Sequence, residues 1–337
     1  MFLSGLLILI LSFVPMLLYA LVLWWLDRYE KEPFGLLSVA FLWGAVPSIV
    51  LALIMQIVLD VPLTAIQSSS QLTYELLGAS VVAPLTEEGI KALALILLLL
   101  LFKREIDSPL DGVIYGGMVG FGFAAVENVF YLFGALTEGG IGEVLGLAFM
   151  RAGIFGLNHA MYTGFTGLGV AMFLEIRNKA LRFIPLVLGF LMSLGAHALH
   201  NALATLTGVG GAGALVAAVL VDWVGVIVLF AVAVGTFFVE RQRILAYTDI
   251  LVRGRVIPES EVAVLKSTFQ RRMARLDLLL RGDVRRWWAL QRYHQKVTEA
   301  AFAWHRLGQG DTAAQPRLVR LEQEFKAFRL EAAPGAD

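Results

Sequence analysis

A small set of ionisable side chains lies inside long apolar stretches of this 337-residue chain. An Asp, Lys or Arg at the centre of a membrane helix costs about 2.5–3.5 kcal/mol to insert, so several such groups together indicate a function. Buried glutamate can take a proton from water, histidine can share that proton transfer, and histidine and asparagine can stabilise an oxyanion. These residue types therefore suggest hydrolysis. The set comprises Glu87, Glu88, Lys91, Glu127, Arg151, His159, His197, His200 and Asp222.

Three of these residues have similar depths in three different apolar segments. Glu87, His159 and His197 lie 15, 16 and 14 residues into segments that begin at 72, 143 and 183. At about 1.5 Å per residue, each is about 21–24 Å along its helix, near the middle of the membrane. Glu127 lies 18 residues into its segment, somewhat nearer the outside. We therefore expect a carboxylate and two imidazoles to meet in one layer.

Spacing within two of these helices supports a shared pocket. Glu87 precedes Lys91 by four residues, so the two can pair on one helix face. His197 and Asn201 have the same spacing, which places an imidazole and a carboxamide on one face. His200 lies about 300° around the helix from His197, so it could line the same pocket or contact a neighbouring helix.

A structural interpretation competes with the catalytic one, because buried polar groups can also form networks that hold helices together. We interpret Arg151 and Asp222 in this way, as interhelical or interfacial contacts. For adjacent Glu87 and Glu88 with two histidines at matching depth, we favour catalysis.

The composition is typical of a membrane protein. Hydrophobic residues make up 58% and charged residues 16% of the chain, whereas soluble globular chains have roughly 45–50% and about 25%. The 27 basic residues balance 27 acidic ones, so no global field attracts nucleic acid. Because the sequence contains no cysteine, disulfides, thiolate nucleophiles and cysteine-ligated metals are excluded.

The elements that must position these side chains are predicted to be all-α. Apolar stretches long enough to cross about 30 Å of hydrocarbon predict a polytopic membrane helix bundle of about seven transmembrane helices in a domain over residues 1–240. The third and fifth stretches are long enough to be tilted, broken or extended past the membrane. Gly116 with Gly120, and Gly142 with Gly146, have spacings that let helix backbones approach closely. The seven spans lie near 3–26, 35–59, 72–102, 109–136, 143–175, 183–207 and 212–239.

The distribution of Lys and Arg predicts the topology. The loops after the first, third and fifth spans are basic, whereas those after the second, fourth and sixth contain no Lys or Arg. Short cytoplasmic loops are enriched in these residues, so we expect a multi-pass cell-membrane protein with its N-terminus outside and its C-terminus in the cytoplasm. The first apolar run exceeds a signal-peptide core and has no basic flank, so we expect a retained helix.

Residues 241–337 are predicted to form a helical cytoplasmic tail. From Glu240 onward the chain has 18 basic and 12 acidic residues, a local net charge of +6. Apolar residues recur at helical spacing between Pro258, Gly282, Gly308 and Pro316, which predicts three amphipathic helices. These helices could form a solvated bundle or lie on anionic lipid.

Four motifs, in this order, resemble those of the PrsW family of membrane proteases, within the superfamily that includes CAAX prenyl endopeptidases and bacteriocin-processing proteins. Residues 87–91 (EEGIK) resemble the EExxK motif, and residues 127–131 (ENVFY) resemble ENxxY. Residues 155–159 (FGLNH) fit FxxxH, and residues 197–201 (HALHN) fit HxxxN. Any one motif alone would be weak, but the four together are specific. The resemblance covers roughly residues 15–240.

This resemblance implies a membrane-embedded endopeptidase with five catalytic residues. Glu87 and Glu88, with His159, would activate the hydrolytic water. His197 and Asn201 would bind the developing oxyanion.

The resemblance also implies supporting residues and a class of substrate. Glu127 and Asn128 would support the site, Lys91 would hold the glutamates, and His200 is left open between the site and a helix contact. The substrate would be a membrane-bound protein, which in one branch of the family is an anti-sigma factor in a stress pathway. The long tail after Glu240 departs from the family core.

Metal use is a separate question, because glutamate and histidine can bind zinc. The HExxH spacing that places two imidazoles on one helix face is absent. A metal-dependent version of the site would use Glu88, His159 and His197. Since carboxylate and imidazole already suffice for general base catalysis, we favour a mechanism without metal.

Two other classes of protein also carry ionisable groups in membrane helices. A proton-coupled transporter would be expected to show interrupted helices in two similar halves, and we find no convincing internal repeat. A retinal-type seven-helix receptor needs a lysine in a late span, whereas Lys91 lies in the third. The polar residues cluster in spans three to six, which favours the peptidase.

Overall fold

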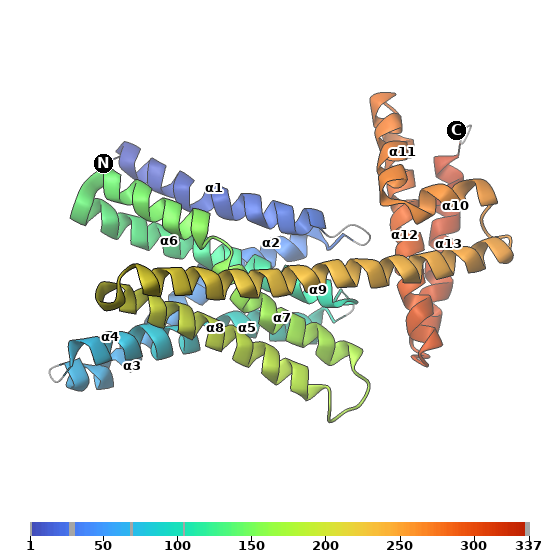
Figure 1. The fold of residues 1–337 in the computed structure, drawn as a ribbon. Coiled ribbons are helices and arrows are strands. Elements are labelled where there is room, and N and C mark those ends of the chain that lie inside the picture. The colour runs from blue at the N-terminus through green and yellow to red at the C-terminus, as the bar shows by residue number, and fades with distance from the viewer. Residues whose placement is uncertain (1, 27–30, 68–69, 104, 334–337) are drawn as a thin grey trace. The chain divides into compact units, whose positions relative to one another are not determined.

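The computed structural model describes residues 2–26, 31–67, 70–103 and 105–333. All regular elements in these ranges are helices, and no strand occurs among them (Figure 1). The prediction of an all-α membrane protein is confirmed, because five described helical segments are long and apolar enough to cross a membrane. These segments are Phe2–Leu26, Phe34–Gln67, Pro109–Glu175, Phe183–Gly208 and Ala212–Arg253.

The predicted count of seven spans differs from these five segments in two places. The segment Pro109–Glu175 contains both predicted spans 109–136 and 143–175. The predicted span 72–102 is not among the five, and it carries the charged residues Glu87, Glu88 and Lys91. The number of membrane crossings therefore stays a prediction.

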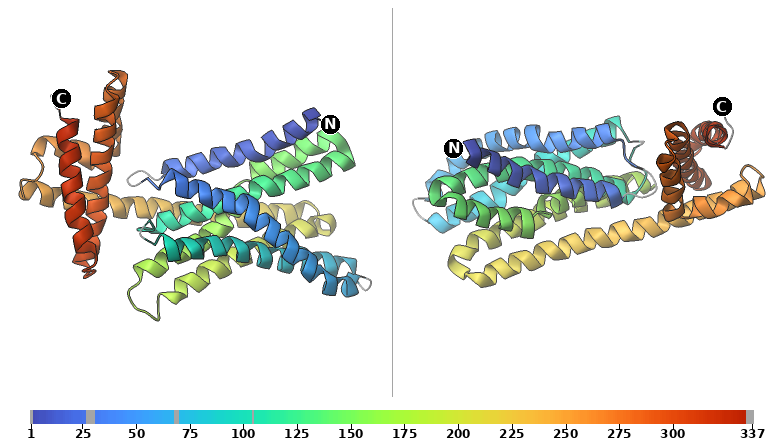
Figure 2. Two further views of the ribbon diagram at one scale, coloured as in Figure 1. Left: turned by 180° about the vertical axis from the view of Figure 1, so that it is seen from behind. Right: turned by 90° about the horizontal axis from the view of Figure 1, so that it is seen from above.

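The first part of the chain forms three helical rods, two of which contain a π-helical turn. Helix α1 (Phe2–Leu26) packs along α6 (Figures 1 and 2). Helix α2 (Phe34–Trp43) continues through the π-helical turn η1 (Gly44–Ser48) into α3 (Ile49–Gln67). Helix α4 (Gln71–Leu77) continues through η2 (Gly78–Val82) into α5 (Ala83–Leu101). Pi-helical turns are often found at functional sites.

The next helices are interrupted at two points. Helix α6 (Pro109–Ala148) begins with a capping box between Ser108 and Asp111 and has a kink at Gly140, where φ is 73°. It is followed by η3 (Phe149–Ile154), a short break, and α7 (Asn158–Glu175). Helices α8 (Phe183–Gly210) and α9 (Ala212–Arg253) follow. His159 therefore lies in the first turn of α7 and not in the middle of one continuous helix.

Glycines on α6 bring its backbone into direct contact with α7. A Cβ atom at Gly116 would lie 2.4 Å from the carbonyl oxygen of Thr163, and one at Gly120 would lie 2.2 Å from that of His159. Close approach of this kind needs residues without a side chain. The prediction of close packing was right for Gly116 and Gly120. It was wrong for Gly142 and Gly146, where an added Cβ atom would meet no other atom within 4 Å.

The chain divides into two compact units, and most of the second is the part of the chain from Gly235, within α9, onward. The C-terminal helices are α10 (Glu259–Lys266), α11 (Thr268–Leu280), α12 (Val284–Gly308) and α13 (Ala314–Ala332). The sequence predicted three helices in this region. The first of these is divided at Ser267, whose extended backbone ends α10 and whose side chain caps α11.

The C-terminal helices have their own apolar core. Tyr293, Val297 and Ala300 of α12 pack with Leu321 and Phe325 of α13. Pro316 was expected to interrupt a helix, but it lies in the first turn of α13, where proline is tolerated because its missing N–H has no helical partner there.

Candidate active site

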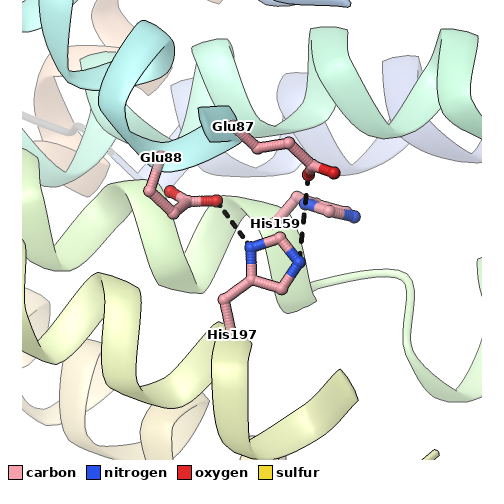
Figure 3. A group of neighbouring side chains, drawn as sticks. All are labelled: Glu87, Glu88, His159 and His197. Atoms are coloured by element: carbon pink, nitrogen blue, oxygen red, sulfur yellow. Dashed lines mark hydrogen bonds and ion pairs between the residues drawn. The ribbon is translucent and has the colours of Figure 1, made fainter. Parts of the chain in front are cut away.

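Four side chains from three helices converge in the N-terminal unit. Glu87 and Glu88 come from α5, His159 from α7 and His197 from α8, and one ligand atom of each lies within 4.8 Å of the others. Figure 3 shows the two carboxylates facing the two imidazole rings. Glu87, Glu88 and His197 are at most 6% exposed. We call these four residues the Glu–His cluster.

Glu88 is held by several partners. Its Oε1 lies 2.9 Å from Nδ1 of His197 and 2.8 Å from Nζ of Lys91. Its Oε2 accepts hydrogen bonds from the hydroxyls of Thr163 at 3.2 Å and Ser193 at 2.9 Å. Because a carboxylate can only accept, Nδ1 of His197 carries the proton of that bond, and its Nε2 faces Glu87. Both oxygens of Glu88 are thus occupied.

Glu87 is held more loosely. Its Oε1 accepts a hydrogen bond of 3.1 Å from Nε2 of Gln56 on α3. Its Oε2 has no hydrogen-bond partner among the described residues, and it lies 3.6 Å from Nζ of Lys91 and 3.9 Å from Nε2 of His197. Glu87 therefore offers a carboxylate oxygen with free acceptor capacity inside the cluster. Gln56 was not predicted to reach the site, although an amide within an apolar helix was a visible signal.

His159 is fixed from both sides of its ring. Its Nε2 lies 2.8 Å from Oε2 of Glu127, and its Nδ1 lies 3.1 Å from Nζ of Lys91. The carboxylate requires a proton on Nε2, so Nδ1 accepts from the lysine ammonium. Lys91 is fully buried and also lies 3.6 Å from the ring centroid of Phe123, a favourable cation–π position.

Arg151 connects Asn128 with Glu127, the residue that bonds His159 directly. Nη2 of Arg151 lies 2.5 Å from Oε2 of Glu127, and its Nε donates to Oδ1 of Asn128 at 2.8 Å. The guanidinium also lies 3.8 Å from the ring centroid of Tyr131. Arg151 was interpreted from the sequence as an interhelical or interfacial contact, and here it contacts two of the predicted supporting residues, one of which, Glu127, bonds His159.

The structure does not bring Asn201 into hydrogen-bond contact with the Glu–His cluster. Its Nδ2 donates to the carbonyl oxygen of Ala79 at 2.8 Å, within the π-helical turn η2. His200 also points to a different partner, because its Nδ1 lies 2.6 Å from Oδ2 of Asp222. Thr163 and Ser193 contact the cluster but were not singled out, since such hydroxyls are common in membrane helices.

The donor set of the Glu–His cluster fits a divalent cation. Two carboxylates and two imidazoles are ligands that zinc accepts, and a carboxylate bonded to the second nitrogen of a histidine is typical of metal sites. His159 has this arrangement through Glu127. The protein also supplies its own positive charge in this cluster, because the Lys91 ammonium contacts Glu88 and His159.

The fold and the site together define a helical membrane protein with a buried cluster of carboxylates and imidazoles. Over residues 32–236 the sequence matches the family described as "PrsW family intramembrane metalloprotease". The chain belongs to the PrsW family, as the four motifs predicted.

One curated relative shows the same relationship. The chain is 35% identical over 124 residues to the protein named "Protease PrsW" of Clostridioides difficile (strain 630). The matched segment covers 37% of this chain and half the length of that relative. No solved structure matches the chain.

Proposed function

We propose that this protein is an intramembrane endopeptidase that hydrolyses peptide bonds of membrane-bound protein substrates. The observation that carries the proposal is the buried Oε2 of Glu87, which has no hydrogen-bond partner among the described residues and lies 3.9 Å from His197 Nε2. The other members of the Glu–His cluster, also suited to proton transfer, surround it. Membership of the family described as intramembrane metalloproteases supports the same activity.

In this proposal Glu87 is the general base. It takes a proton from water as the water oxygen bonds to the scissile carbonyl carbon, and the protonated Glu87 then gives that proton to the leaving amine as the C–N bond breaks. The products are one carboxyl terminus and one amine, so the overall reaction consumes one water. Glu88 acts by holding His197 and Lys91 in place.

The oxyanion would be stabilised by His197 and Asn201. His197 would donate from Nε2 when this nitrogen carries a proton, because its Nδ1 is already engaged with Glu88. Asn201 uses one N–H on the carbonyl of Ala79 and keeps a second N–H for the substrate. His159, held by Glu127 and Lys91, would support proton transfer on the other side of the cluster.

A zinc ion would be held by Glu87, Glu88, His159 and His197, the four residues whose donor atoms converge. When bound, such an ion acidifies water and polarises a carbonyl group. The mechanism that we propose uses no metal ion. In it, the ammonium group of Lys91 supplies the positive charge in the cluster.

The expected partners are the lipid bilayer and a membrane-bound protein with a cleavable segment near the membrane. More specifically, we propose that the substrate resembles an anti-sigma factor. We further propose that the protein lies in the plasma membrane with its N-terminus outside and its C-terminus in the cytoplasm, since basic loops alternate with loops that lack Lys and Arg.

This topology can be tested with single cysteines, because the natural sequence has none. A cysteine replacing Lys179 should be labelled by an impermeant maleimide only after the membrane is opened. A cysteine replacing Glu138 should be labelled in intact cells. The reverse pattern would overturn the proposed orientation.

The activity is tested by quantitative mapping of new protein N-termini in membranes that contain the wild type or Glu87→Gln at equal abundance. Glu75→Gln provides a matched control, because Glu75 is an exposed glutamate whose carboxylate bonds Gln71 on α4. We expect cleavage products with the wild type and with Glu75→Gln, and none with Glu87→Gln. Identical profiles in all three membranes would contradict the proposed hydrolysis and make flux assays for transport the next experiment.

A further inference from the structure

A second polar cluster lies beside the Glu–His cluster and is centred on a carboxylate of α9. Asp222 is 1% exposed, and its Oδ2 accepts hydrogen bonds from Asn158 Nδ2 at 2.9 Å and His200 Nδ1 at 2.6 Å. Its Oδ1 accepts one from the hydroxyl of Tyr162 at 3.2 Å. A buried carboxylate is costly unless it is well paired, and Asp222 is paired by side chains of two other helices.

Tyr162 connects Asp222 with both imidazoles of the Glu–His cluster. Its ring stacks on that of His197, with centroids 4.7 Å apart and planes 12° apart. The same ring meets His159 edge to face, at 5.7 Å and 79°. A stacked aromatic ring can still slide or tilt, but the bond between the Tyr162 hydroxyl and Asp222 limits that freedom.

Asn158 provides a second connection, through the backbone. It is the first residue of α7 and directly precedes His159, so the bond from its amide to Asp222 holds the helix start that carries this imidazole. His200 completes the arrangement, because its ring packs edge-on against Phe155 in the break before α7. Two independent contacts of Asp222 thus lead to two different members of the Glu–His cluster.

We propose that Asp222 is a positioning residue, whose carboxylate holds Tyr162 and Asn158 and thereby sets the ring orientations of His197 and His159. This inference rests on the proposed peptidase function, for which ring orientation matters because small displacements of reacting groups strongly reduce rate. Asp222 itself touches neither carboxylate of the Glu–His cluster among the described contacts.

Two variants distinguish the role of the Asp222 carboxylate from that of the Tyr162 ring. Asp222→Asn keeps the size of the side chain but removes the charge and places an amide among hydrogen-bond donors. Tyr162→Phe keeps the ring that stacks on His197 and removes only the bond to Asp222. Asp60→Asn is a matched control, because Asp60 on α3 accepts a 2.8 Å hydrogen bond from the hydroxyl of Tyr74 on α4. That pair makes no described contact with the Glu–His cluster.

The first readout is magnetic resonance of histidine and needs no substrate. The chain has five histidines, so isotope labelling of this residue type in bilayer-embedded protein gives few signals, and His197 is assigned from its loss in His197→Gln. Ring currents from the stacked Tyr162 should displace the His197 signals in the wild type. We expect Asp222→Asn and Tyr162→Phe to shift or broaden them, and Asp60→Asn to leave them unchanged. An unchanged His197 signal in Asp222→Asn would overturn the proposal.

The second readout is the yield of Glu87-dependent N-termini per folded protein molecule. We expect Asp222→Asn to lower this yield about 10–100-fold, as is typical when a side chain that orients a functional group is removed. Tyr162→Phe should lower it less, and the double variant should be no worse than Asp222→Asn, because the two changes break the same contact. Less folded protein with an unchanged yield per folded molecule would show that Asp222 only stabilises the fold.

These two readouts also separate this inference from the proposed function. If the wild type produces no Glu87-dependent cleavage, the peptidase proposal fails, and the histidine signals still report whether Asp222 orients the rings. If cleavage is present but both readouts are insensitive to Asp222→Asn, the peptidase proposal stands and the positioning role is wrong.

Discussion

Glu87 and Glu88 are adjacent in the chain, yet their carboxylates are held in different ways. Glu88 has partners on both oxygens, including the ammonium of Lys91 at 2.8 Å and His197 at 2.9 Å. Glu87 has Gln56 on one oxygen and no hydrogen-bond partner among the described residues on the other. The first arrangement suits a structural anchor and the second suits a base that must exchange a proton.

Glu88→Gln should therefore destabilise the protein more than Glu87→Gln. Removing one partner of a buried ion pair costs about 3–5 kcal/mol, because the remaining charge is left uncompensated, here on the fully buried Lys91. Thermal unfolding of the purified variants in the same bilayer mimetic measures the difference. Both variants should lack cleavage activity, but only Glu88→Gln should lose much stability. Equal losses would contradict the different roles assigned to the two carboxylates.

Gly116→Ala should disturb the site from a distance. The added methyl group would lie 2.4 Å from the carbonyl oxygen of Thr163, so α6 and α7 must separate, and Thr163 is one of the residues that donate to Glu88. Overpacking of this kind costs about 1–3 kcal/mol. Gly134→Ala is the control on the same helix, because no atom lies within 4 Å of its Cβ position.

For these glycine variants we expect a lower unfolding temperature and less cleavage for Gly116→Ala. Gly134→Ala should be neutral or slightly stabilising, since alanine favours helix by up to about 1 kcal/mol over glycine. Equal behaviour of the two variants would mean that the α6–α7 contact can relax without cost.

Treatment with a chelator tests whether the mechanism operates without a metal ion. With the Lys91 ammonium supplying the positive charge between Glu88 and His159, cleavage should survive extensive dialysis against the chelator. Metal analysis of the purified protein provides the second measurement. One zinc per chain that is lost in His159→Ala, together with activity that returns on adding zinc, would establish a metal-dependent site at the Glu–His cluster instead.

The C-terminal helices should lose stability in mild acid through His294. This side chain is 4% exposed and its Nδ1 has no hydrogen-bond partner among the described residues. Burial, together with the nearby guanidinium groups of Arg271 and Arg275, holds the pKa of His294 well below its usual range. The unfolded helices therefore bind a proton at this residue that the folded helices do not bind.

The sign of the pH effect follows from this difference in proton binding. Stability is unaffected above the ordinary histidine pKa of about 6.5 and falls by up to about 1.4 kcal/mol per pH unit below it. Hydrogen exchange of α12 peptides in the full-length protein, corrected for intrinsic rates, measures this between pH 7.5 and 5.5. His294→Leu should remove much of the dependence, whereas replacing the less buried His305 by leucine should not. A pH dependence that persists in His294→Leu would assign it to other groups.

Much of the fold is predictable from local sequence. Apolar stretches of membrane-spanning length give the helices, because an unpaired backbone group in hydrocarbon is too costly for other structures. The sequence did not locate the interruption between η3 and α7, because this interruption depends on packing against another helix. A Cβ atom at Gly156, within the interruption, would lie 2.7 Å from the Tyr19 ring of α1. The division of the C-terminal region at Ser267 was also missed, because apolar residues continue across it at helical spacing.

The gathering of Glu87, Glu88, His159 and His197 was predicted from their depths along the apolar segments. The depth of His159, however, was counted along one continuous helix, which the break before α7 interrupts. The individual hydrogen bonds of these residues were not predicted. Asn201 shares a helix face with His197 by spacing, yet its amide bonds the carbonyl of Ala79, which is offered by a π-helical turn of another rod.

Residue order therefore establishes the membrane environment, the helices and the inventory of polar groups, since each follows from chain length, hydropathy and spacing. It does not establish how those groups are paired. The separate environments of Glu87 and Glu88, the link from Arg151 to His159 through Glu127, and the connection from Asp222 to His197 through Tyr162 all join side chains of different helices. Such pairs depend on the rotation and close approach of whole helices, which glycines such as Gly116 permit only once the bundle has formed.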